Sequence, residues 1–270
     1  MSSDWNTVIF ESPTQILCEL SELHGKQWLC RGQSKSYGGL IPSIDRKKLR
    51  KMPRPDKIKL EYQSIRLFQS TARFFSHPGE QLALSDKFIA LMILRHYGVP
   101  TRLLDWSGSP YVAAYFASAG HDGEDGELWA FDRPFYQKKG AEQWKKWPET
   151  TSDGSGDPSK FDGNLTAFRV DEPPDWFIAV FYPVGFSRQN VQSGAYTCTA
   201  RFGRDHSIAI AELLQDPSRH IRYILKADLK PVLRNTLRDR YGIWRGSLFP
   251  DTAGAADLAR TVFPGDSNNS

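Results

Sequence analysis

Three short segments combine residue types that can bind an anionic ligand, and the first of them centres on Arg31. This arginine closes an apolar run at 27–31 and is followed directly by Gly32 and Gln33. A guanidinium in such a place can bind two oxygens of a phosphate or a carboxylate at once. A glycine beside it lets a ligand or a neighbouring chain approach closely. The segment predicts an anion clamp, and the alternative is an arginine that forms a salt bridge across a sheet.

The second segment, at 95–117, places polar side chains beside a series of aromatic residues. Residues able to bind or to transfer protons follow one another around a single turn: His96, Tyr97, Arg102, Asp105, Trp106 and Ser107. A helix that begins at Ser109 comes next, and the free N–H groups of a helix start can bind an anion. One interpretation is a functional cleft. The other is a core cluster in which His96, Arg102 and Asp105 pair with one another, closed to solvent.

Two geometric expectations follow from these segments. The strand ends at Arg31 and Asp105 should lie side by side, although 74 positions separate them, because apolar strands that end in polar and small residues build clefts. Arg102 precedes two leucines, so we expect it to be partly buried and paired, with a carboxylate as its partner. We expect Asp105 to serve ligand binding instead.

The third segment is an amide-rich turn at 187–197 that leads into a strand. Its Asn190 and Gln192 have side-chain amides that can read a ligand's amide, ribose or base edge, although they can equally cap a loop. A basic run at 46–59 carries eight basic residues and one acidic residue. Such a run is typical of a solvated connection and less often forms an arm that contacts phosphates. Its Lys47, Lys48, Arg50 and Lys51 would then belong to a broad basic face.

Hydrophobic periodicity indicates the elements that hold these segments. Apolar residues spaced by three and four predict a helix over 56–76, Ser85 is the expected cap of a second helix that stops at Gly98, and Ser109 with Pro110 starts a third. Aromatic and β-branched runs predict short strands at 27–31, 127–131, 176–182, 194–200 and 221–229. Helices come early and most strands come late, which predicts an α+β protein with a mainly antiparallel sheet flanked by helices.

Composition bounds the class of protein. The chain has 270 residues, 40% of them hydrophobic and 24% charged, with 35 basic and 31 acidic side chains. These values exclude collagen-like, coiled-coil and wholly disordered chains. Three scattered cysteines and six dispersed histidines predict neither a disulfide framework nor a metal site. The longest apolar run, at 88–94, is far too short to cross a membrane, so we expect a cytoplasmic protein without membrane contact.

Four groups of residues resemble the FRG domain family. The family's opening motif is similar to Cys30-Arg31-Gly32-Gln33, and its strongest signature is similar to RHYGVPTRLLDWS at 95–107 together with AAYFA at 113–117. Two further stretches, at 189–196 and 248–251, resemble its later motifs. The resemblance implies one FRG domain over 27–262. An N-terminal segment at 1–26 would pack on it, a surface loop would fill 147–166, and 263–270 would form a disordered tail.

A weaker similarity links the same segments to ADP-ribosyltransferases, which also combine an Arg-Gly strand, a small polar strand before a helix with an A..F pattern, and a final Glu or Gln. It implies an ADP-ribosyltransferase-like fold that uses NAD as a substrate without a metal. Arg31 would hold the pyrophosphate or ribose, with Gly32 and Gln33 beside it. Asp105, Trp106 and Ser107 would shape the nicotinamide pocket. The residues left for stacking, catalysis and further ligand contacts are Tyr97 or Tyr115, His96, Gln192, Arg102 and Asn190.

The resemblance implies a transferase or NAD glycohydrolase, of the kind found in toxins and phage defence, with a protein or a nucleic acid as acceptor. Gln192 stands where such enzymes carry an acid, and a neutral amide cannot stabilise a cation as a carboxylate does, so Asp105 is the alternative for that role. Two other interpretations stay open. One is a module that binds a nucleotide or nucleic acid without turnover, and the other is an interaction domain in which the second segment is a core cluster.

Overall fold

The computed structural model describes residues 5–74, 78–148, 151–157, 160, 162, 178–181, 191–199, 201–250, 254–256 and 259. Part of the loop expected at 147–166 and all of the tail expected at 263–270 lie outside these residues.

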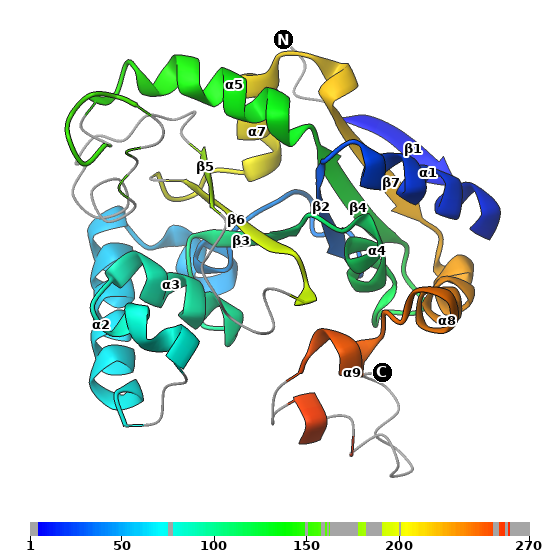
Figure 1. The fold of residues 1–270 in the computed structure, drawn as a ribbon, viewed down its shortest axis with the longest axis horizontal. Coiled ribbons are helices and arrows are strands. Elements are labelled where there is room, and N and C mark those ends of the chain that lie inside the picture. The colour runs from blue at the N-terminus through cyan, green and yellow to red at the C-terminus, as the bar shows by residue number, and fades with distance from the viewer. Residues whose placement is uncertain are drawn as a thin grey trace.

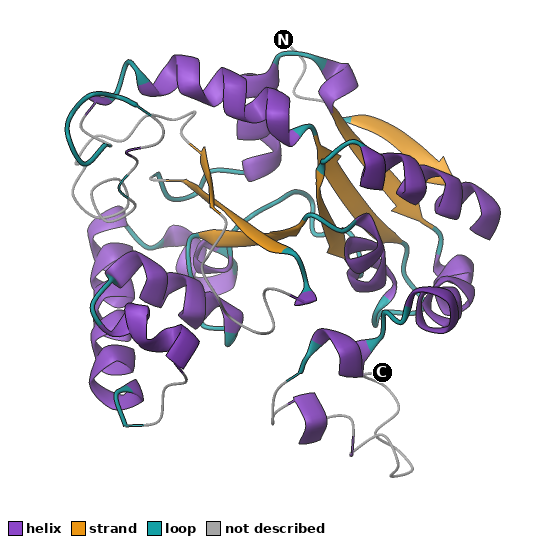
Figure 2. Ribbon diagram, in the orientation of Figure 1, coloured by secondary structure: helices purple, strands orange, loops and turns teal. Residues whose placement is uncertain are grey.

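One seven-stranded sheet organises the described chain, and it is antiparallel except where its first strand pairs in parallel with its neighbour. Figure 2 shows this sheet running through the middle of the molecule with helices around it. The α+β class with a mainly antiparallel sheet is therefore confirmed. In sheet order the strands are β1 (Asn6–Phe10), β7 (His220–Leu225), β4 (Gly126–Phe131), β2 (Leu29–Gln33), β3 (Leu103–Ser107), β6 (Gly194–Thr199) and β5 (Ile178–Phe181).

Three groups of helices cover the sheet (Figure 1). The first packs on one face through Leu20, Val112 and Leu233, against Cys30 and Tyr223 of the strands. The second packs on the other face against Leu29 and Trp106, and the third covers the β3–β6 end. The first group is α1 (Pro13–Gly25), α4 (Pro110–Ser118) and α8 (Lys230–Tyr241); the second is α5 (Arg133–Trp144) and α7 (His206–Leu214); the third is α2 (Arg54–Ala72) and α3 (Lys87–His96).

The closest approach between a helix and the sheet is made by α4 on β2. A Cβ atom on Gly32 would lie 1.9 Å from the backbone oxygen of Ala113, so only glycine fits at this position. Gly32 therefore allows a neighbouring chain segment to approach, and this contact brings the middle of α4 against the end of β2.

Helix starts follow local capping chemistry, with one correction to the expected boundaries. Ser109 caps α4 by accepting a hydrogen bond from the Val112 amide. The cap of α3 is Asp86 and not Ser85, because the Asp86 carboxylate accepts from the Ile89 amide at 2.8 Å. The helix α2 begins at Arg54, after Pro53, since proline is tolerated in a first turn. Among the residues that the structure describes, no helix combines the length and apolar character needed to span a membrane.

Candidate anion-binding site

The site lies where β2 and β3 diverge. These strands pair only at Cys30 and Ser107, whereas each pairs along its length with its other neighbour. The guanidinium of Arg31 bridges the opening, where its Nη1 donates a hydrogen bond to the carbonyl oxygen of Asp105 at 2.6 Å. Arg31 and Asp105 therefore lie side by side as expected, but each is the middle residue of its strand and not the strand end.

Asp105 is held by a second arginine that the sequence analysis did not assign to the site. Arg95, near the end of α3, donates from Nη2 and Nε to Asp105 Oδ2 at 2.6 and 2.9 Å. Arg31 Nη1 lies 3.7 Å from the same oxygen. The only sequence signal for Arg95 was its place in the second segment, because helix periodicity does not tell which strand a helix end will face.

The charges of the site act on one another. Loss of hydration would raise the pKa of Asp105, but Arg95 and Arg31 hold it below its usual value, so this carboxylate is ionised at neutral pH. The pKa of Arg95 is raised by Asp105. Burial lowers the pKa of Arg31 to about 10, and the charges of Arg95 and Arg46 add to that lowering. Arg31 is therefore less well compensated than Arg95.

The space beside these groups is a pocket of about 290 Å³. Five of the predicted site residues line it, together with Cys30, Arg95, Ala113 and Phe116; the five are Arg31, Gly32, Asp105, Trp106 and Ser107. Two guanidinium groups and one carboxylate give it a net positive charge. Arg31 Nε is buried and has no hydrogen-bond partner among the described residues. A buried donor without a partner is uncommon in folded proteins.

Gln192 comes close to this pocket only through its backbone. Ser107 Oγ donates to the Gln192 carbonyl at 2.7 Å, and Gly108 N donates to the Ser193 carbonyl at 2.8 Å. The Gln192 side chain donates instead to the Leu248 carbonyl at 2.9 Å. The expectation that Gln192 lines one pocket with Arg31 and Asp105 is therefore wrong in this structure, because that amide is used to hold the chain near Leu248.

His96 and Tyr97 lie at the end of α3 and do not line the pocket. Their rings contact each other at 5.1 Å between centroids, and the Tyr97 hydroxyl donates to Glu80 Oε1 at 3.0 Å. Tyr115 does not line the pocket either, because it is buried in the core under α4. The ring that this helix contributes to the pocket is Phe116, the neighbour of Tyr115, which the sequence showed only as part of the AAYFA motif.

Arg102 is a structural residue. It is fully buried, its Nε donates to Glu61 Oε2 at 2.9 Å, and its guanidinium lies 4.3 Å from the Phe202 ring centroid. The predicted burial and pairing with a carboxylate are confirmed, and the predicted ligand contact is wrong because Glu61 of α2 occupies the guanidinium. The core cluster of His96, Arg102 and Asp105 is also wrong, since Arg102 and Asp105 have different partners.

Two further predicted contacts lie elsewhere. Gln33 is buried and donates to Glu127 Oε2 at 3.1 Å, away from the pocket. Asn190 lies outside the described residues. Trp106 borders the pocket, but its Nε1 donates to Thr197 Oγ1 at 2.8 Å, so its polar atom is already satisfied.

Comparison with known proteins gives one match. The family model named FRG domain matches residues 26–126, a stretch that contains Arg31, Arg95, Asp105 and the helix α4. No curated protein and no solved structure matches the chain. The extension of the domain to residue 262 stays a prediction. The chain thus carries an FRG domain at 26–126.

Proposed function

We propose that the pocket between β2 and β3 binds a phosphate-bearing part of NAD, and that the protein uses NAD as the donor in ADP-ribosyl transfer or in NAD hydrolysis. The observation that carries this proposal is the state of Arg31. Its side chain is only 12% exposed, its Nε has no partner among the described residues, and burial lowers its pKa to about 10. A bound phosphate would supply the missing negative charge through the part of the side chain that remains exposed.

The order of segments along the sheet supports the same proposal. Arg31 on β2, Ser107 at the end of β3 and Gln192 just before β6 belong to three neighbouring strands. The sequence separations are 74 residues between Arg31 and Asp105 and 85 residues between Ser107 and Gln192. ADP-ribosyltransferases combine three separated motifs of this type, so the arrangement favours an NAD-consuming activity over binding of an unrelated anion.

Pocket size sets which part of NAD can enter. A volume of about 290 Å³ is at the lower end of ligand pockets, which span roughly 300–1,000 Å³. The pocket suits one nucleotide half with its ribose and phosphate, and the other half would extend from the mouth. Phe116 supplies the apolar wall, while Arg31 and Arg95 supply the anion contacts.

Asp105 is the residue that we assign to the chemistry. Cleavage of the nicotinamide bond builds positive charge on the ribose, and an ionised carboxylate stabilises that charge. Asp105 is ionised, and its side chain is 45% exposed, whereas Gln192 is neutral and engaged by Leu248. Because its pKa is lowered, Asp105 would act as a negative charge and not as a proton donor. A toxin or phage-defence role is the biological setting that we propose for such an activity.

The decisive experiment is calorimetric titration of NAD, ADP-ribose and ATP into the wild type, Arg31→Lys, Arg31→Ala and the control Arg240→Ala. Arg240 is exposed on α8, so its loss changes the net charge equally without touching the pocket. We expect Arg31→Ala to weaken binding by about ten- to a hundredfold. We expect Arg31→Lys to recover only part of this loss, because an ammonium lacks the two-pronged fork.

A nicotinamide-release assay on the same variants separates turnover from binding. Release by the wild type but not by Asp105→Asn would support the enzyme. Binding without release would favour the second candidate, a nucleotide-binding module without turnover. The neutral Gln192, in the position where such enzymes carry an acid, is consistent with this candidate. The nucleotide proposal fails if the wild type binds none of the three compounds at millimolar concentration.

A further inference from the structure

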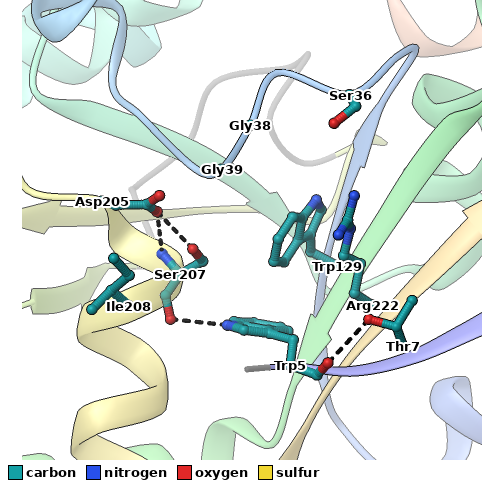
Figure 3. Close-up of a pocket in the computed structure, with 10 residues that line it drawn as sticks. All are labelled: Trp5, Thr7, Ser36, Gly38, Gly39, Trp129, Asp205, Ser207, Ile208 and Arg222. Carbon is teal, nitrogen blue, oxygen red and sulfur yellow. Dashed lines mark hydrogen bonds between the residues drawn. The ribbon is translucent and has the colours of Figure 1, made fainter. Parts of the chain in front are cut away.

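A second concave surface, separate from the pocket of Arg31, runs beside the loop that follows β2. Two hollows of about 560 and 960 Å³ share Gly38, Asp205 and Ile208 in their walls, so they adjoin each other, and together they are here called the basic trough. Figure 3 shows the smaller hollow, where the loop of Ser36 and Gly38 lies above Trp129 and Arg222 on one side and Asp205 on the other.

Cations outnumber carboxylates in the walls of the basic trough. The cations are Arg46, Lys47, Arg50, Arg204 and Arg222, and the carboxylates are Asp45 and Asp205. Both carboxylates are used within the fold. Asp45 Oδ1 accepts from the buried Lys57 Nζ at 2.5 Å, and Asp205 Oδ1 accepts from the amides of Leu40 and Ser207 at 3.0 and 2.8 Å. The charge of Asp45 is therefore balanced by Lys57, whereas Asp205 keeps its negative charge, because backbone amides are neutral donors.

Three of the cations lack a counter-charge. In the described part of the chain, Arg46, Lys47 and Arg50 form no ion pair with a carboxylate, and Lys47 and Arg50 are exposed. Arg204 and Arg222 pair with Glu212 and Glu127. The trough is therefore a surface that attracts more than one negative group.

An exposed aromatic ring lies among these cations. Tyr37 lines the larger hollow and is 46% exposed. Arg46 and Lys35 lie 5.6 and 6.0 Å from its ring centroid. A stacking ring flanked by cations is the combination that holds a base together with its neighbouring phosphates.

We propose that the basic trough binds a single strand of nucleic acid, with a base against Tyr37 and backbone phosphates on Arg46, Lys47 and Arg50. The length of the trough, across two hollows, exceeds what one phosphate needs. Its concave shape and its exposed ring favour an unpaired strand over a duplex, whose bases are stacked inside. An acidic peptide would use the cations but would have no need of the ring.

The trough reaches the neighbourhood of the pocket. Arg95 Nη1 contacts Ser43 Oγ at 3.4 Å, and Ser43 precedes Arg46 by three positions. A strand in the trough would thus pass close to the proposed NAD site and would be its acceptor. That role as acceptor rests on the proposed function, whereas binding of the strand does not.

Fluorescence anisotropy with a labelled single-stranded DNA of about 12 nucleotides, and with the RNA of the same sequence, tests the proposal. Tyr37→Ala should weaken binding by roughly fivefold to a hundredfold, and Tyr37→Phe should bind like the wild type, because both phenylalanine and tyrosine present a ring face. Arg50→Ala should reduce the slope of log K against log salt by about 0.7, the value for one phosphate contact on a single strand.

The variant Lys47→Gly tests whether binding is lost because a charge is removed and not because the protein misfolds. Lys47 has a φ of 50°, a left-handed conformation that favours glycine, so this variant removes a charge while it relieves the backbone. It should weaken binding, and the control Arg240→Ala should not. Equal losses in Lys47→Gly and Arg240→Ala would overturn the proposal in favour of diffuse electrostatic attraction. Equal affinity for the duplex would also overturn the proposal. A Tyr37→Ala variant that binds like the wild type would overturn it as well.

The two proposals can fail separately. NAD titration depends on Arg31, and we expect it to be unchanged in Tyr37→Ala and Lys47→Gly. If the protein binds the oligonucleotide but not NAD, the proposal for the basic trough stands and the proposed NAD-using activity is rejected. If the protein binds NAD but not the oligonucleotide, the proposed NAD site stands and the proposal for the basic trough is rejected.

Discussion

Two buried arginines on neighbouring parts of the sheet have opposite surroundings. Arg102, just before β3, is fully buried, and burial would lower its pKa, but the charge and hydrogen bonds of Glu61 raise it above the usual value. Arg31, on β2, shares one carboxylate with Arg95, keeps a bare Nε, and has its pKa lowered to about 10 by burial. The guanidinium charge is fully compensated in Arg102, whereas in Arg31 it is only partly compensated and the Nε atom has no partner among the described residues.

The difference separates a residue that holds the fold from one that is available to a ligand. A buried charge without full compensation costs stability, and such costs concentrate at functional sites. Residue type alone does not separate the two roles, because both arginines lie beside apolar strand residues, Arg31 after Leu29 and Cys30 and Arg102 before Leu103 and Leu104. The number and charge of the partners decide between the two roles.

The largest expected effect comes from breaking the compensated pair. Arg102→Ala should lower the free energy of unfolding by about 3–5 kcal/mol, because it leaves Glu61 ionised and buried without a partner. Urea denaturation measures this loss. The double variant Arg102→Met with Glu61→Leu should recover most of it, and a double variant that is less stable than Arg102→Ala would contradict this account of the pair.

The second prediction concerns His206, a buried histidine whose pKa is also affected by the charge of Arg31. Burial, with a further contribution from Arg31, lowers the pKa of His206 to about 3. The folded state therefore binds fewer protons than the unfolded state, and the stability due to His206 is complete above pH ~6.5 and is lost as the pH falls towards 3. Between pH 7 and pH 5 this loss is about 2 kcal/mol.

Denaturation at both pH values isolates this effect. His206→Gln should lose about 2 kcal/mol less than the wild type between pH 7 and pH 5, since glutamine does not titrate. Arg31→Met should show an intermediate loss, because the pKa of His206 rises once the neighbouring charge is removed. An identical pH dependence in His206→Gln and in the wild type would show that His206 is not the acid-sensitive group.

A third prediction concerns the carboxylate that Arg31 shares. Asp105→Asn should cost about 1 kcal/mol of stability, well below the loss in Arg102→Ala, because Asp105 is partly exposed and its ion pairs are screened by solvent. It should leave the binding of ADP-ribose intact or tighter, since the pocket becomes more positive, while nicotinamide release falls at least about tenfold. Weaker ADP-ribose binding would mean that Asp105 contacts the ligand through a hydrogen bond.

The smallest expected change in stability belongs to Arg31 itself. Arg31→Met keeps the length of the side chain and removes a poorly compensated charge, so the free energy of unfolding should stay within about 1 kcal/mol of the wild type. A loss of nucleotide binding with little loss of stability would complete the contrast with Arg102. A loss as large as that of Arg102→Ala would place Arg31 among the structural residues.

Local sequence determined the elements that depend on a few neighbouring residues. The start of α4 at Ser109 and Pro110, the strand of Arg31 and the α+β class all follow from capping, turn chemistry and periodicity, which act within one or two turns of chain. The error at α3 was also local, since Ser85 and Asp86 are adjacent capping residues and the structure uses the carboxylate. The FRG motifs were readable for the same reason, because they are contiguous in the sequence.

Only the tertiary structure decided the partners of the charged residues. Glu61 lies 41 positions from Arg102, and the Leu248 carbonyl that engages Gln192 lies 56 positions away. Arg95 was passed over and Gln192 was misplaced because both depend on which strand a helix end or a turn faces. Sequence spacing limits such choices weakly, because an ion pair or a hydrogen bond forms wherever packing of the elements brings two groups within about 3 Å. Topology therefore made Arg102 a part of the core and left Arg31 open to a ligand.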